Sequence, residues 1–221
     1  MSEKNYFETK NLSLRIQCLE GRRIAFLATD GVEQLELIEP KLALESAGAL
    51  VDIISPHNGV IKAWHQHNWG DNIPIDVHLS IASVENYDAL VLAGGLLNQD
   101  KLRNQAAAVR FLQDFVKEGK PIAAIGHGVQ ILIETTNLKD RYLTSWPALK
   151  TDLVNAGAHW INKDVVVDNG LITSRTIDDI PSFIQVIIRE FSERPTRESF
   201  SRNNFISILS LTSWLIIFLS I

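Results

Sequence analysis

The fold is decided by the stretch Pro121-Ile122-Ala123-Ala124-Ile125-Gly126-His127-Gly128. Its first five residues form a short, continuous apolar run, which is typical of a strand buried on both faces. The apolar pattern from Val129 to Thr135 predicts a helix immediately afterwards. A chain that turns sharply from strand to helix exposes the residue at the tip of the bend, and the first N–H groups of the helix point at it. The stretch therefore predicts an α/β sheet with a site at Gly126–Gly128.

Outward from this stretch, short apolar runs alternate with helical patterns, which predicts a mostly parallel sheet covered on both faces, a three-layer α/β/α sandwich. Ligands of such sheets bind beyond the carboxyl ends of the strands, here the loops 30–36, 93–100 and 126–128. The segments 60–63 and 75–77 predict a hairpin insertion. Strands are predicted at 23–28, 50–55, 88–93, 121–125, 165–167 and 171–174, and helices at 37–47, 105–118, 129–135 and 180–191.

Composition divides the chain into an N-terminal extension (1–21), an α/β domain (22–192) and a hydrophobic C-terminal tail (193–221). The net charge of −5 is spread along the chain, which argues against a nucleic-acid partner. Cys18 is the one cysteine, so no intrachain disulfide can form. The polar N-terminus lacks the apolar core of a secretory signal, and we expect a cytoplasmic protein.

The tail is open to three interpretations. Residues 205–221 carry no charge, and Arg197 and Arg202 precede them. This length is about the lower limit for a membrane span, and the flanking arginines would keep the domain on the cytoplasmic side. The segment could instead pack on the domain or on a partner, or the coding sequence could depart from its ancestral frame after about Phe191.

Several segments carry a resemblance to a known family. They are Ala28–Leu37, Trp64 with Trp69-Gly70-Asp71, Asp88–Gly95, Ala124–Gly128, Leu143–Pro147 and Asp152–Ala158. Their order and spacing resemble the PfpI-like family of the class I glutamine amidotransferase-like superfamily, which has a flavodoxin-like sandwich. The resemblance implies a hydrolase of the intracellular cysteine peptidase, glyoxalase III or protein deglycase kind. It also implies a homodimer or a dimer-built hexamer, acting on a small carbonyl compound or a peptide.

The resemblance assigns the site residues, and one of them departs from the family pattern. Family members read Ala-Ile-Cys-His-Gly where this chain has Gly126, so the nucleophilic sulfur is absent. His127 matches the histidine beside the nucleophile, and Glu36 matches the acid that contacts the sulfur in relatives. Cys18 lies before the first strand and outside the motif. The remaining expected binding residues are Glu33, Gly94, Gly95, Gly128, Trp69 and Asp100, of which Asp100 would match an acid lent across a subunit interface.

Each of these residues also has a purely structural interpretation. Gly126 would relax a strained bend, so the fold should persist without the thiol. His127 could pack at a helix start, and Glu36 could be a first-turn acid favoured by the helix dipole. His57, His65, His67 and His78 lack a closing ligand motif, so we predict no metal site, and no cofactor is expected.

Three functions remain open from the sequence. The first is a PfpI-like enzyme whose covalent catalysis is impaired, with His127 and Glu36 left for acid–base catalysis. The second is a catalytically silent binding or stress-related regulatory member that keeps the pocket and the oligomer surface, and the third is a membrane-tethered interaction protein. The substitution Gly126→Cys should create a low-pKa thiol and measurable activity if the rest of the site is intact.

Overall fold

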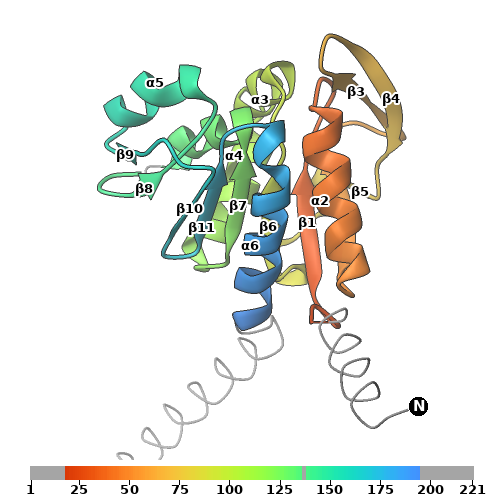
Figure 1. Cartoon of the computed structure of the whole chain (residues 1–221). Coiled ribbons are helices and arrows are strands. Elements are labelled where there is room, and N and C mark those ends of the chain that lie inside the picture. Colours follow the sequence, from red (N-terminus) through yellow and green to blue (C-terminus); the bar gives the residue numbers. More distant parts are fainter. Residues whose placement is uncertain (1–17, 136–137, 195–221) are drawn as a thin grey trace, which may run out of the picture.

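The computed structural model describes residues 18–135 and 138–194, which form a seven-stranded sheet with helices on both faces (Figure 1). The strand order is β10-β11-β7-β6-β1-β2-β5. Every neighbouring pair is parallel except β10 and β11, which form an antiparallel edge hairpin. The predicted mostly parallel sheet is therefore confirmed, and its carboxyl ends meet at one edge.

The elements have the following bounds. The sheet consists of β1 (Arg23–Leu27), β2 (Leu50–Ser55), β5 (Val77–His78), β6 (Ala89–Leu92), β7 (Ile122–Ile125), β10 (Val165–Asp168) and β11 (Leu171–Ser174). Two small sheets pair β3 (Val60–His65) with β4 (Asn68–Pro74) and β8 (Tyr142–Leu143) with β9 (His159–Trp160). The α-helices are α2 (Gln34–Ser46), α3 (Leu96–Arg103), α4 (Ala106–Lys117), α5 (Lys150–Asn155) and α6 (Ile180–Glu193). The 3₁₀ segments are η1 (Leu79–Ile81), η2 (Val84–Asn86), η3 (Gly126–Thr135), η4 (Pro147–Leu149) and η5 (Ile177–Asp179).

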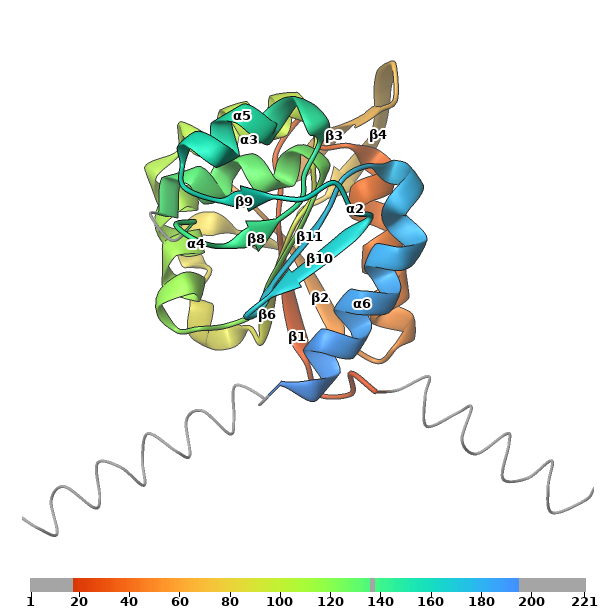
Figure 2. The ribbon, with the colours of Figure 1, turned by 60° about the vertical axis from the view of Figure 1, so that its left-hand side comes forward.

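Two apolar layers sandwich the sheet. On one face, α2 and α6 lie side by side and bury Leu37, Leu44 and Phe183 against it (Figures 1 and 2). On the other face, α3, α4 and η3 bury side chains such as Leu102 and Phe115. The strands β6 and β7 are buried at every position, which explains their unbroken apolar sequences.

The structure corrects three local predictions. The hairpin insertion pairs β3 with β4 (Asn68–Pro74) and not with residues 75–77, because β5 joins β2 in the main sheet. The segment after Gly126 is a 3₁₀ helix, which begins at the glycine itself. The helix α3 has a weakly apolar sequence and few periodic positions, so sequence patterning missed it.

The predicted extension and tail fall mostly outside the described residues. Of the extension, Leu19 is fully buried and its N–H donates to Ala47 O at 2.9 Å. The possible anchor at 205–221 lies beyond residue 194. Within the parts of the chain that the structure describes, no helix has the length and apolar character needed to cross a bilayer.

Candidate functional site

The predicted bend lies at Gly126, directly after β7. Gly126 has φ +60°, a left-handed conformation that costs an L-residue roughly 1–2 kcal/mol. It is buried at the carboxyl end of β7, and its carbonyl accepts the N–H of Trp146 at 3.2 Å. The glycine thus permits a bend that another residue could adopt only with strain.

The carboxyl group of Glu36 fills the space beside this glycine. A Cβ atom at residue 126 would lie 2.6 Å from Glu36 Oε1 and 2.9 Å from Glu36 Oε2, closer than van der Waals contact allows. Glu36 stands in the first turn of α2, and its Oε2 accepts the N–H of Gly94 at 2.8 Å. The first turn of α2 and the loops after β6 and β7 therefore meet at one carboxyl group, at the carboxyl edge of the sheet.

Glu36 is an acid that burial keeps protonated. It is 5% exposed, and burial together with the charge of Glu33 raises its pKa to about 8. The Gly94 N–H opposes this rise but does not cancel it. Because no cation pairs with Glu36 among the described residues, the carboxyl group is neutral over most of the physiological range.

His127 lies beside the bend, half-buried under an aromatic ring. Its imidazole stacks on Trp146 with ring centroids 5.6 Å apart and planes inclined by 25°. Burial lowers the pKa of His127, which favours the neutral ring. Trp146 belongs to one of the quoted motifs, but no sequence pattern predicts that its ring stacks on His127.

The turn at Gly94 and Gly95 is organised by Asn98, a residue that sequence reasoning missed. Asn98 is fully buried, and its Nδ2 donates to Ala93 O and Gly94 O at 3.0 and 2.9 Å. Its Oδ1 accepts the N–H of Thr29 at 2.8 Å, which ties the loop after β1 to the turn after β6. A polar residue just after a Gly-Gly turn was the available signal.

Close backbone approaches explain the other glycines of the site. A Cβ atom at Gly94 would collide with Glu36 Oε2, and one at Gly128 would collide with Leu92 O. At Gly95, φ is +93° and a Cβ atom would collide with Gly31 O. These glycines let three loops pack around Glu36 without intervening side chains.

Glu33 lies next to this group but does not share a helical face with Glu36. It occupies the N-cap of α2 with extended backbone angles, and both carboxylate oxygens lie 3.4 Å from Gln66 N. Burial raises the pKa of Glu33 as well. The hairpin β3–β4 positions this loop, since Trp64 N donates to Val32 O at 2.7 Å and Gly31 N donates to Lys62 O at 2.8 Å.

Trp69, Asp100 and Cys18 are not part of the group around Glu36. Trp69 is 52% exposed on β4 and contacts Trp64 edge to face, with centroids 5.5 Å apart. Asp100 is exposed on α3. Cys18 is exposed and precedes β1, at the amino end of the sheet, so it cannot replace a thiol at the bend.

The histidines of the insertion do not form a metal site. His65 ends β3 and His67 lies in the turn that follows, so the two do not share a strand face. Within residues 18–135 and 138–194, no three His, Cys, Asp or Glu side chains are arranged to hold a metal ion.

Comparison with known families gives the same picture. Residues 22–190 match the model of the DJ-1/PfpI family. This chain belongs to the DJ-1/PfpI family. An uncharacterized protein from Staphylococcus epidermidis is 36% identical over 173 residues, which cover 77% of this chain and 98% of the relative. An uncharacterized Staphylococcus aureus protein is 37% identical over 172 residues, covering 76% and 98%.

Solved structures of this family share the fold. A two-domain protein from Anabaena variabilis, with DJ-1/ThiJ/PfpI-like and ferritin-like domains, matches with a TM-score of 0.71 and 33% identity over 76% of this chain. The match covers 49% of that protein, so this chain spans about half its length. Drosophila melanogaster DJ-1beta matches with a TM-score of 0.71 and 24% identity, covering 83% of this chain and 97% of that one. The family fold is therefore shown, while these relatives' names assign no reaction to this chain.

Proposed function

We propose that this protein is a DJ-1/PfpI member that keeps the family pocket but has lost thiol-dependent catalysis, and that it binds a small carbonyl compound without a covalent bond. The observation that carries the proposal is the contact at Gly126. The position that would bear sulfur has no side chain, and the carboxyl group of Glu36 fills the adjoining space. Covalent catalysis by peptidase, glyoxalase or deglycase members would need a thiolate there.

The site retains groups suited to a carbonyl oxygen. A neutral carboxylic acid can donate a hydrogen bond, and Glu36 has a pKa of about 8. The N–H groups of the first turn of a helix have no acceptor within the helix, and η3 begins at the bend. Together they support recognition of a carbonyl by hydrogen bonds alone.

The test uses two probes on the purified full-length protein. Methylglyoxal should show no catalytic turnover above that in buffer, and peptide mapping by mass spectrometry should find no adduct on residues 126–128. Hydroxyacetone, which keeps the ketone without the reactive aldehyde, should shift the NMR signals of the Gly94 and Gly126 amides. Glu36→Ala should weaken this binding, with Glu39→Ala, an exposed position of α2, as the matched control. Two results would contradict the proposal. One is catalytic turnover of methylglyoxal by the wild type, and the other is an equal affinity of Glu36→Ala and the wild type for hydroxyacetone.

A second function, residual proton transfer, is favoured by the protonation states of Glu36 and His127. Burial keeps Glu36 protonated and His127 neutral, which provides an acid and a base in one site. General acid–base catalysis contributes typically ~10²–10⁴-fold. Slow methylglyoxal turnover that disappears in both Glu36→Gln and His127→Ala would establish this function in place of simple binding.

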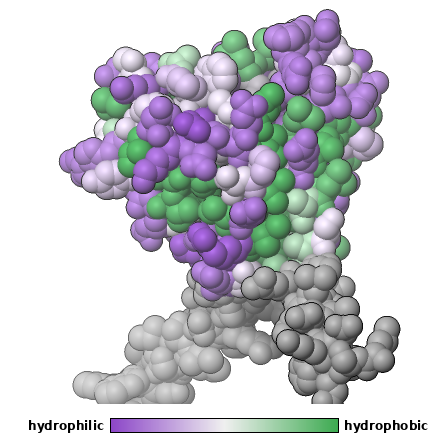
Figure 3. Space-filling view, in the orientation of Figure 1, coloured by the Kyte–Doolittle hydropathy of each residue, from purple (hydrophilic) through white to green (hydrophobic). Residues whose placement is uncertain are grey.

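We also propose that the protein assembles with itself in the cytoplasm, as the family resemblance implies. Hydrophobic side chains gather over α2 and α6 in the view of Figure 3, and Leu42 of α2 is 56% exposed. An apolar face of this kind supports a subunit interface. Light scattering on the purified protein should give at least a dimer mass, whereas a monomer would contradict the proposal. Membrane tethering through 205–221 would require recovery of native protein in the membrane fraction.

A further inference from the structure

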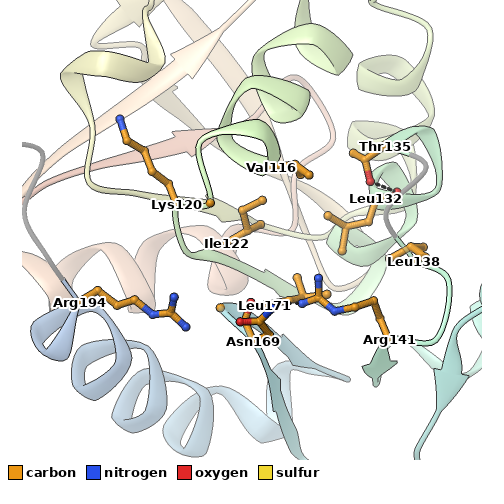
Figure 4. Close-up of a pocket in the computed structure, with 12 residues that line it drawn as sticks. Val116, Lys120, Ile122, Leu132, Thr135, Leu138, Arg141, Asn169, Leu171 and Arg194 are labelled. Atoms are coloured by element: carbon orange, nitrogen blue, oxygen red, sulfur yellow. Dashed lines mark hydrogen bonds between the residues drawn. The ribbon is translucent and has the colours of Figure 1, made fainter. Parts of the chain in front are cut away.

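A cavity lies at the opposite end of the sheet from Gly126. Its volume is about 170 Å³, and it opens at the amino ends of β7 and β11, where Ile122 and Leu171 line it (Figure 4). Gly126 follows the other end of β7, so the length of that four-residue strand separates the two sites by at least about 10 Å. The cavity is therefore distinct from the candidate site.

Three basic side chains line this cavity, but two of them are already neutralised. Lys120 Nζ lies 2.9 Å from Glu118 Oε2 and donates to Val84 O, and its ammonium group points away from the cavity in Figure 4. Arg141 Nε lies 2.8 Å from Asp168 Oδ2, and its Nη2 donates to the backbone of the β10–β11 turn. Each of these cations is balanced by a carboxylate at short range.

Arg194 differs from the other two. Its guanidinium group points into the cavity, toward Asn169 and Leu171 (Figure 4). Among residues 18–135 and 138–194, no carboxylate or carbonyl accepts a hydrogen bond from this group. A guanidinium is always charged in proteins and offers parallel N–H donors. The cavity therefore holds one positive charge without a counter-charge from the described residues.

The surrounding structure holds Arg194 in this position. Arg22, which is 7% exposed, donates to the carbonyls of Ser192 and Arg194 and so fixes the end of α6. The guanidinium lies over Gly170, where a Cβ atom would come within 3.1 Å of Nη2. Gly170 has φ +85° and completes a two-residue turn with Asn169. The turn thus leaves open the space that the arginine occupies.

The remaining wall combines apolar side chains with the polar residues Thr135 and Asn169. Side chains of Val116, Ile122, Leu132, Leu138 and Leu171 line the cavity, which is smaller than the pockets of about 300–1,000 Å³ that bind drug-sized ligands. One guanidinium without a partner among the described residues matches one carboxylate in charge and in bidentate geometry. A doubly charged phosphate would need a further cation, and Lys120 and Arg141 are already paired.

We propose that this cavity binds a small aliphatic carboxylate, whose carboxylate group pairs with Arg194 and whose alkyl chain lies against Ile122, Leu132 and Leu171. The ligand is held by one charge-assisted pair and by apolar burial. It does not require the site at Gly126, so its binding is independent of the proposed carbonyl recognition.

The experiment titrates the full-length protein with butyrate and follows backbone amide signals by NMR. Saturable shifts are expected at Gly170 and Leu171, with none at Gly94 or Gly126. Arg194→Gln should weaken binding about tenfold or more, because hydrogen bonds to charged groups contribute roughly 1.5–3 kcal/mol. Arg189→Gln, at an exposed position of the preceding helix α6, is the matched control and should bind as the wild type does.

Two further probes distinguish the contribution of the ligand's carboxylate charge from that of its alkyl chain. Butan-1-ol, which keeps the alkyl chain without the charge, should bind more weakly than butyrate, and so should inorganic phosphate. Equal affinity of Arg194→Gln and wild type would overturn the proposal, and so would shifts confined to Gly94 and Gly126. Phosphate binding as tight as that of butyrate would overturn the assignment to a carboxylate.

Discussion

Two buried carboxyl groups, at the starts of the neighbouring helices α2 and α6, are stabilised in different ways. Asp179, 7% exposed at the start of α6, receives two hydrogen bonds from Arg175 at 2.8 and 2.9 Å. Glu36, 5% exposed at the start of α2, receives one hydrogen bond from a backbone N–H and pairs with no cation among the described residues. The first arrangement stabilises a charge that serves the fold. The second disfavours the charged form and keeps a neutral acid at the carboxyl edge of the sheet, and such a raised pKa is typical of functional sites.

The largest expected effect concerns the pH dependence that Glu36 imposes on stability. The pKa of Glu36 in the folded state, about 8, lies above its ordinary value of 4.5, so protonation of Glu36 stabilises the folded state. This stabilisation is complete below the ordinary pKa. It is lost as pH rises through the pKa of the folded state, at up to about 1.4 kcal/mol per pH unit. Glu36→Gln mimics the protonated acid and should therefore be more stable than the wild type at pH 8, by about 3–5 kcal/mol.

Urea unfolding at pH 5 and pH 8 measures this difference. Glu39→Gln, exposed on the same helix, is the control and should follow the wild type at both pH values. An unchanged gap between Glu36→Gln and the wild type across this range would mean that Glu36 titrates normally and that the contrast with Asp179 is false.

The second expected effect is the loss of the pair at Asp179. Asp179→Asn keeps the shape of the side chain but removes the charge that accepts both hydrogen bonds from Arg175, and should destabilise the fold by about 1.5–3 kcal/mol. Asp178→Asn, at an exposed neighbouring position, should change the free energy of unfolding by much less. Equal midpoints of urea unfolding for the two variants would show that the Arg175 pair contributes nothing to the fold.

A third, smaller effect separates backbone strain from crowding at the bend. Gly119 and Gly126 have nearly the same φ, +63° and +60°, but a Cβ atom at Gly119 meets nothing within 4 Å. Gly119→Ala should cost about 1–2 kcal/mol from strain alone, and Gly126→Ala should cost more because the new methyl group collides with Glu36. Thermal unfolding of both variants gives the comparison, and shortening Glu36 to Asp should recover part of the extra loss at Gly126. Equal losses at the two glycines would mean that Glu36 moves aside freely.

This crowding also changes what the Gly126→Cys substitution should do. In the single variant, the new side chain must displace the Glu36 carboxyl group, because the two would otherwise overlap. The double variant Gly126→Cys with Glu36→Asp leaves more room, so it should show the faster labelling by iodoacetamide. A single variant that reacts as fast as the double variant would show that Glu36 does not block the position.

The smallest expected effect is on His127. Trp146→Leu removes the ring that stacks on the imidazole, so the histidine gains water and its pKa should move back up toward its ordinary value. NMR titration of the His127 ring detects the shift, and Trp69→Leu, distant on the β3–β4 hairpin, is the control. A downward or absent shift would indicate that burial by Trp146 is not the cause.

Much of the fold was predictable because its strands are short, apolar and bounded by glycines. The run Leu50–Ser55 is a strand with the predicted bounds, and the strand before Gly126 begins one residue later than predicted. The prediction for 75–77 was wrong because a two-residue strand such as β5 pairs through its neighbours in space and has no periodicity of its own. The helix α3 was missed because its buried residues include Asn98 and Gln99, whose burial depends on hydrogen bonds to the Gly94 turn.

The candidate site was likewise predictable only in part. The motif placed Gly126 at a bend and Glu36 nearby, because both follow strands whose carboxyl ends meet at one edge. The roles of Asn98 and Trp146 could not be predicted, since both act through partners on other loops.

The sequence alone determined the alternation of strands and helices, the family and the absence of sulfur at residue 126, since each is a property of local order along the chain. Only the tertiary structure decided that the Glu36 carboxyl group fills the vacant space and that Arg194 faces a cavity in which no described residue places a carboxylate beside it. Both depend on how segments far apart in sequence pack together, and this packing sets the charge state of Glu36 and brings no carboxylate of residues 18–135 and 138–194 to Arg194.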